Sequence, residues 1–194
     1  MSKRSEIGLY ITKKIQYFVE TNDYVSLAKL RRGVGHRPEE LPELYGLILK
    51  DMPDVFWNSN GKITKTEWSC YIALTLFAWH QQGRDLKTQC MHVSKKHESI
   101  GKAMRTMVTA NKDSNAEDRM QKKLQILITS KDITEFAYHL KNIITLMRSE
   151  GIGINYSELA KDIYSFQYED SRNQVSLKWG QDFYRVNKEE KNNE

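Results

Sequence analysis

Residues 68–79 read Trp-Ser-Cys-Tyr-Ile-Ala-Leu-Thr-Leu-Phe-Ala-Trp, the most apolar stretch of the chain. In a helix, this stretch would place apolar side chains on almost every side, and a helix that is apolar all round lies inside a protein core. It is far shorter than the roughly 20 residues that a membrane-spanning helix needs. We therefore predict a buried central helix here.

Apolar residues recur at helical spacing before this stretch, and only 3 prolines and 10 glycines interrupt the whole chain. Near the start, steps of four, four and three residues place four side chains on one helical face. These are Ile7, Ile11, Ile15 and Phe18. A short helix is expected over residues 23–32, ended by Gly33 and Gly35, and another is expected to begin at Pro42.

The second half of the chain carries further amphipathic segments. Apolar spacing predicts helices over residues 120–128 and 133–147, whose short linker makes them an antiparallel hairpin. Two more helices are expected over residues 159–166 and 175–186. Because no strand pattern competes, we predict an all-α fold.

A polar segment, residues 111–117, separates the two halves. We interpret it as a short polar hinge joining two small helical bundles, an N-terminal one over residues 1–110 and a C-terminal one over residues 111–194. A single continuous bundle is the alternative. The polar residues 188–194 are expected to fray. No secretory signal or membrane-spanning segment is evident, which predicts a cytoplasmic protein without membrane contact.

The net charge of +5 is unevenly distributed along the chain. Residues 1–37 carry eight Lys or Arg against three acids, and residues 84–105 carry six against two. Residues 38–60, in contrast, carry one against five. Two basic segments separated by an acidic one indicate a positive surface for a polyanion and a different surface for a protein neighbour. Charge alone does not decide this, since many basic proteins bind no polyanion.

Cysteine and histidine do not form a recognisable metal site. Cys90, His92 and His97 lie within eight residues, but no second pair completes the four ligands of the common zinc patterns. We expect these three to be solvent-facing loop residues. Cys70 lies inside the apolar helix, so reduced thiols are expected. No phosphate-cradling glycine loop is present, and we predict neither metal nor cofactor.

An enzyme is one alternative to a binding protein. Arg31 and His36 have the spacing of an Arg and His pair used by some helical ribonucleases. Gly33 and Gly35 lie between them and would break the helix that must direct both side chains to one phosphate. We therefore predict no catalysis. A ribonuclease using this pair and a helical adaptor that binds only protein remain the competing hypotheses.

The basic residues that remain share helix faces or lie at a helix end. They are Arg31 and Arg32, Lys102 and Arg105, and Arg119, Lys122 and Lys123. Side chains of this kind neutralise phosphates without reading bases, which predicts salt-sensitive, sequence-tolerant binding of nucleic acid. A solvated helix face would give the same pattern for any single residue.

Several short pieces of sequence point to a known family. In order they are Leu30-Arg31-Arg32, Leu41-Pro42-Glu43-Leu44-Tyr45, Ser99-Ile100-Gly101-Lys102-Ala103-Met104, Lys122-Lys123, Leu140-Lys141 and Lys178-Trp179-Gly180-Gln181-Asp182-Phe183-Tyr184. In this order and helical setting the chain resembles the small subunit, of CasB type, of the type I-E CRISPR surveillance complex called Cascade. The resemblance covers most of the length.

The resemblance implies a function and a set of partners. Members of this family are all-helical, are not enzymes and are present in two copies in Cascade. They contact the guide RNA and target DNA hybrid and help to hold the displaced strand, which keeps the R-loop open. The implied partners are therefore guide RNA, target DNA, the large and backbone subunits of Cascade, and a second copy of this chain.

The resemblance also implies where nucleic acid is contacted. The basic contacts of the family fall on Arg32, Lys102, Lys123 and Lys141, with a basic loop near Lys95 and Lys96. Asn142 stands where a second basic residue is expected, and lysines that replace arginines keep the charge but lose the bidentate fork. The complete set of candidates adds neighbouring cations. It comprises Arg31, Arg32, Lys95, Lys96, Lys102, Arg105, Arg119, Lys122, Lys123, Lys141 and Lys178.

Overall fold

The computed structural model describes residues 2–58, 60–94, 99–111 and 113–185. Within these ranges the chain forms α-helices and short 3-10 helices and no β-strand. One isolated bridge joins His92 to Ile154. The predicted all-α fold is thus confirmed.

Most of the helices lie on the predicted segments, although the helix expected over residues 175–186 begins earlier, at Glu169, and one segment differs in kind. The α-helices are α1 (Lys3–Thr21), α2 (Tyr24–Arg32), α3 (Tyr45–Ile48), α4 (Lys65–His80), α5 (Ile100–Ala110), α6 (Ala116–Ile128), α7 (Ile133–Glu150), α8 (Tyr156–Phe166) and α9 (Glu169–Tyr184), and the 3-10 helices are η1 (Pro38–Glu40), η2 (Pro42–Leu44) and η3 (Asp54–Phe56). The segment that differs in kind begins at Pro42, where η2 and the single turn α3 replace the expected longer helix. Gly46 weakens a helix there, and Asp51 adopts a positive φ of 64° that turns the chain away.

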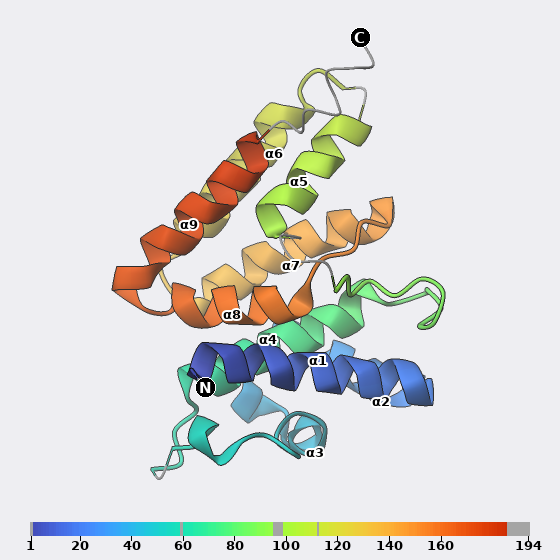
Figure 1. The fold of residues 1–194 in the computed structure, drawn as a ribbon, viewed down its shortest axis with the longest axis vertical. Coiled ribbons are helices and arrows are strands. Elements are labelled where there is room, and N and C mark those ends of the chain that lie inside the picture. Colours follow the sequence, from blue (N-terminus) through green and yellow to red (C-terminus); the bar gives the residue numbers. More distant parts are fainter. Residues whose placement is uncertain (1, 59, 95–98, 112, 186–194) are drawn as a thin grey trace.

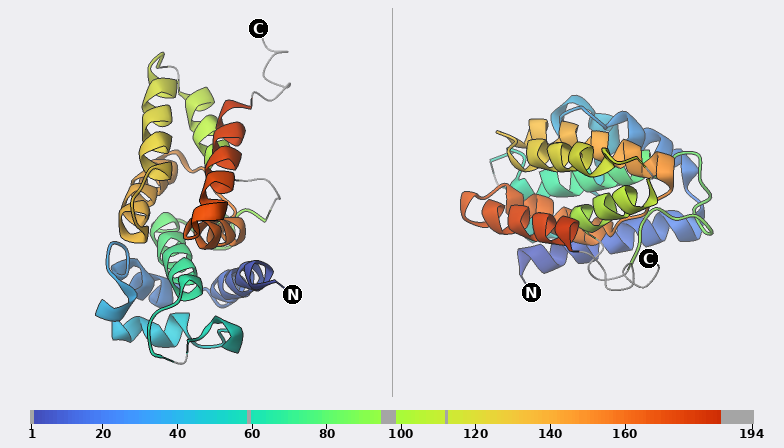
Figure 2. Two further views of the ribbon diagram at one scale, coloured as in Figure 1. Left: turned by 90° about the vertical axis from the view of Figure 1, so that its left-hand side faces the viewer. Right: turned by 90° about the horizontal axis from the view of Figure 1, so that it is seen from above.

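α4 is the buried helix that the apolar stretch predicts. Every residue from Thr66 to Ala78 is buried, and α4 packs against α1, α2, α7 and α8. Figure 2 shows α4 lying between α1 and α2 in the lower half of the molecule. A capping box fixes its start: the Thr64 hydroxyl accepts from the backbone N–H of Glu67, and the Glu67 carboxylate accepts from that of Thr64. The core is therefore organised around one helix whose first turn is fixed by a capping box.

A second group of helices lies on the other side of α7 and α8. Figure 1 shows α5, α6 and α9 above these two helices. α5 packs on α9 at Gly101, where an added Cβ would overlap the carbonyl oxygen of Trp179. Only glycine lets the two backbones approach so closely. Gly101, part of a sequence piece that the resemblance linked to nucleic-acid contact, is thus required by helix packing.

The buried side chains form one continuous core that extends through both halves of the chain. α8 packs mainly on α1 and α4, whereas α5 packs on α6, α7 and α9. The division into bundles over residues 1–110 and 111–194, joined by a hinge, stays a prediction. Among the described residues, no helix combines the length and the apolarity needed to cross a membrane.

Candidate nucleic-acid interface

Two cations of α7, Lys141 and Arg148, lie beside the half-buried Trp79 of α4. Two more, Arg31 of α2 and Arg84 after α4, lie near Arg148. We call Arg31, Trp79, Arg84, Lys141 and Arg148 the Trp79 cluster. The Arg148 guanidinium carbon lies 4.5 Å from the centre of the Trp79 ring, and the Lys141 ammonium nitrogen lies 5.3 Å from it. Both distances allow cation–π attraction.

The spacing of α7 explains how this cluster is assembled. Lys141, Thr145 and Arg148 follow one another at i, i+4 and i+7, which places them on one helical face toward Trp79. The Trp79 indole N–H donates to the Thr145 hydroxyl over 3.0 Å. Arg148 donates to the carbonyl oxygen of Trp79 over 3.3 Å and to the Gln82 side chain over 2.8 Å. The end of α4 is therefore fixed against α7 by polar contacts.

Among the residues that the structure describes, no carboxylate neutralises the positive charge of the cluster. In the described part of the chain, none of its four cations forms an ion pair. Burial lowers the pKa of Arg31, and the nearby charge of Arg148 lowers it further. Carbonyl groups at helix ends accept some of the hydrogen bonds of these cations, since Arg84 donates to the Arg148 carbonyl oxygen over 2.8 Å. Like charges held this close favour an anionic ligand.

Four of the sequence candidates are paired with acids instead, the fourth being Lys178 in the network described below. Arg32 lies 3.5 Å from the Glu43 carboxylate, and Arg105 lies 3.3 Å from that of Glu117. Arg119 pairs with Asp113 within the segment that leads into α6. The Nε atom of Arg105 is buried without a hydrogen-bond partner among the described residues. Ligand phosphates would have to compete with these carboxylates.

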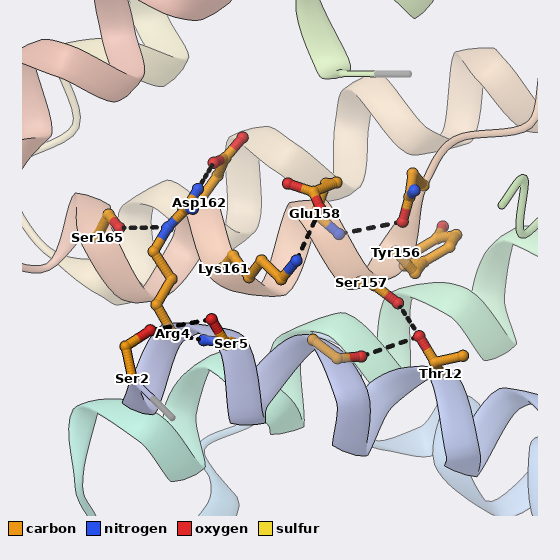
Figure 3. A network of polar contacts seen from close by, with 12 residues as sticks. Ser2, Arg4, Ser5, Thr12, Tyr156, Ser157, Glu158, Lys161, Asp162 and Ser165 are labelled. Carbon is orange, nitrogen blue, oxygen red and sulfur yellow. Dashed lines mark hydrogen bonds and ion pairs between the residues drawn. The ribbon is translucent and has the colours of Figure 1, made fainter. Parts of the chain in front are cut away.

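Lys178 is part of a structural network. Figure 3 shows Asp162 of α8, a carboxylate that is 2% exposed, facing Arg4 of α1. Asp162 accepts from Arg4 over 2.9 Å, from Lys178 over 2.8 Å and from the Trp179 indole over 3.0 Å. A buried carboxylate requires such partners. The Lys178 ammonium group is therefore used to join α9 to α8.

The remaining candidates lie on α5 and α6 or outside the described residues. Lys122 is exposed on α6 and Lys123 is half-buried beside it, and in the part of the chain that the structure covers neither forms an ion pair. Lys102 is half-buried in the first turn of α5. Lys95 and Lys96 fall outside the described residues.

The residues of the ribonuclease and metal-site hypotheses have other contacts in the structure. His36 pairs with Glu40 at 3.2 Å in the turn after α2, while burial and the charge of Arg148 lower the pKa of Arg31. Among the described residues no group of three metal-ligating side chains is assembled. His92 is half-buried, whereas the sequence predicted a solvent-facing side chain. Its Nδ1 accepts from the backbone N–H of Tyr156 over 3.2 Å, because the loop pairs with the start of α8, and burial lowers its pKa to about 4.

Comparison with known proteins identifies the family. The family model of the CRISPR-associated protein Cse2 matches residues 26–184. The chain belongs to the Cse2 family. The predicted resemblance to the Cascade small subunit is thereby confirmed.

Solved structures of Cse2 proteins extend the match over nearly the whole chain. The crystal structure of CasB from Thermobifida fusca is 26% identical, with a TM-score of 0.72, covering 93% of this chain and 98% of its own. A Cse2-family protein from Thermus thermophilus is 14% identical with a TM-score of 0.66, covers 91% and 97% respectively, and shows likeness of fold. Comparison with curated proteins finds no sequence match.

Sequence reasoning on this Cse2 chain found two of the four clustered cations and missed the other two. Arg31 and Lys141 were candidates, whereas Arg84 and Arg148 were not. The i, i+7 relation of Lys141 and Arg148 was a usable signal, because it places both on one face of a helix. No local signal links Arg84 to them, since it follows α4 and reaches α7 only through the tertiary fold.

Proposed function

We propose that this chain is a non-catalytic subunit of a type I-E Cascade complex that binds guide RNA and target DNA through phosphate contacts. It stabilises the RNA–DNA hybrid and the displaced strand of the R-loop. Its partners are the large and backbone subunits and a second copy of itself. The Trp79 cluster is the main contact surface, with Lys122 and Lys123 of α6 as a second one.

The observation that carries this proposal is the accumulation of four cations without a carboxylate partner among the described residues. R-loop formation exchanges one duplex for another at nearly balanced free energy, so a few phosphate contacts from a protein can shift the equilibrium. The displaced strand requires a positive surface that tolerates any sequence.

A salt series tests the proposal. Binding of labelled single-stranded DNA and of an RNA–DNA hybrid is measured for the wild type and for Arg31→Gln with Lys141→Gln. We expect weaker binding to unrelated sequences and a salt slope smaller by about 0.7 to 0.9 for each phosphate contact removed. Lys123→Glu with Lys141→Glu should weaken binding further without changing the helical circular-dichroism signal.

Lys13→Gln with Lys62→Gln is the matched control, since it removes the same charge from exposed positions outside the cluster. Equal slopes for the control and the cluster variant would contradict the proposed surface. No binding at low salt would favour the protein-only adaptor, and metal-independent strand cleavage that His36→Ala abolishes would favour the ribonuclease.

A further inference from the structure

An apolar hollow lies at the end of the molecule opposite α5 and α6. It is enclosed by the loops of residues 38–63 and the first turns of α4, and its volume is about 230 Å³. Its apolar wall is formed by Leu44, Tyr45, Ile48, Trp57, Ile63 and Tyr71. We call it the Trp57 hollow. Figure 1 shows the loops around α3 at one end of the longest axis.

Large apolar side chains are exposed beside this hollow for a structural reason. Phe56 in η3 is 1% exposed and packs edge-on against Tyr10, which anchors this loop in the core. Its neighbours Val55 and Trp57 therefore point outward, and they are 45% and 44% exposed. Tyr45 is 41% exposed. Neighbouring apolar side chains left in water around a concavity mark a contact surface for another molecule.

The charge around the hollow is opposite to that of the Trp79 cluster. Residues 38–63 carry five acidic and two basic side chains. Glu39 lines the hollow, and neither it nor Asp54 forms an ion pair among the residues described. Burial raises the pKa of the Tyr71 phenol on the wall, and the charges of the glutamates before α3 raise it further. Glu40, Glu43 and Asp51 are paired with His36, Arg32 and Lys14, and Lys62 also lines the hollow. The negative charge that remains disfavours a phosphate ligand and favours a basic partner.

We propose that the Trp57 hollow is a docking site for a basic protein segment that inserts one aromatic or long aliphatic side chain. An apolar anchor in a pocket with a charged rim is the usual arrangement of an interface hot spot. The site is separate from the nucleic-acid surface proposed above, and its occupation leaves α6 and the Trp79 cluster free. Positive side chains of the partner lie against the acidic rim, and the anchor displaces water from the hollow.

Three labelled peptides test this site on the full-length chain. The first has a central Trp flanked by Lys and Arg, the second replaces the Trp by Ser, and the third replaces the Lys and Arg by Glu. We expect fluorescence anisotropy to show that the first binds at least about tenfold tighter than the other two. Trp57→Ser should lose at least about tenfold in affinity for it.

Two further variants control the experiment. Leu177→Ser removes an apolar side chain that is 62% exposed on α9, and it should bind like the wild type. Glu39→Lys with Asp54→Lys should reverse the preference between the basic and the acidic Trp peptide while the thermal melt stays unchanged.

Other occupants would overturn the proposal. Equal binding of the Ser peptide, or full affinity in Trp57→Ser, would show that the hollow takes no anchor. Weaker binding of labelled single-stranded DNA by Trp57→Ser than by the wild type would place nucleic acid there. Self-association in sedimentation equilibrium that Trp57→Ser abolishes would make the occupant a second copy of the chain.

Discussion

Replacing Asp162 by asparagine tests whether Arg4 and Lys178 serve the fold. The carboxylate is 2% exposed and accepts from both cations and from the Trp179 indole. The asparagine side chain would keep the shape but lose the charge, and its amide would direct N–H groups at a cation. Two charge-assisted hydrogen bonds each contribute about 1.5 to 3 kcal/mol. Arg4 and Lys178 are 45% and 38% exposed, so water solvates both cations after the change. We therefore take the lower limit for each bond, and the free energy of unfolding should fall by about 3 kcal/mol.

Urea unfolding followed by circular dichroism measures this loss, and the melting temperature should fall by roughly 6 to 12 °C. The matched control is Glu158→Gln on the same helix. Glu158 pairs with Lys161 at 2.7 Å in a partly exposed position, and its loss should cost less than about 1 kcal/mol. A loss below about 1 kcal/mol for Asp162→Asn, equal to that of the control, would refute this account and return Lys178 to the ligand-binding candidates.

Two other perturbations have outcomes that the structure determines. Gly101→Ala should destabilise the chain by about 1 to 3 kcal/mol in a thermal melt, because α5 and α9 must separate to make room for the methyl group. Gly180→Ala has open space at its Cβ and should be neutral or slightly stabilising. A larger loss for Gly180→Ala than for Gly101→Ala would contradict the close contact of the two helices. Acidification should weaken the fold, because burial lowers the pKa of His80 and of His92 to about 4. In the unfolded chain these histidines bind a proton near about pH 6.5. The stability that each contributes is therefore complete above about pH 6.5 and is lost as the pH falls toward 4. Urea unfolding at pH values between 7 and 4.5 should show that the free energy of unfolding falls by about 2 kcal/mol for each histidine. A free energy of unfolding that does not change over this pH range would contradict the prediction.

Most of the helices could be predicted from the sequence, because the spacing of apolar residues that defines a helix face lies within the helix itself. Each helix face repeats at a spacing that the residues themselves display, and caps such as Thr64 and Asp132 mark the first turns. The segment after Pro42 was harder, because a turn of 3-10 helix and a short α-helix share the same apolar spacing. There the backbone of Asp51, rather than the apolar pattern, decides the outcome.

The candidate site could be predicted only in part, because it depends on tertiary contacts. A lysine that joins two helices and a lysine available to a phosphate look alike in sequence, as Lys178 and Lys122 illustrate. Trp79 belongs to the apolar stretch, yet its position at the end of α4 leaves it half-buried among cations. Only the packing of α4 against α7 brings Arg148 to Trp79 and Arg84 to the end of α7.

The packing of α1 on α8 has a consequence for biosynthesis. The apolar face of α1 carries Ile7, Ile11 and Ile15, and α8, which covers much of it, begins only at Tyr156. A ribosome releases α1, α2 and α4 long before α8 exists, so until residues 156–166 have been made the part of α1 that α8 covers has no native partner. The Asp162 network closes later still, because Lys178 and Trp179 must also have left the exit tunnel. The core is therefore completed only after α8 and α9 have been made, and a nascent chain that stalls before α8 presents the cell with a partly uncovered row of isoleucines.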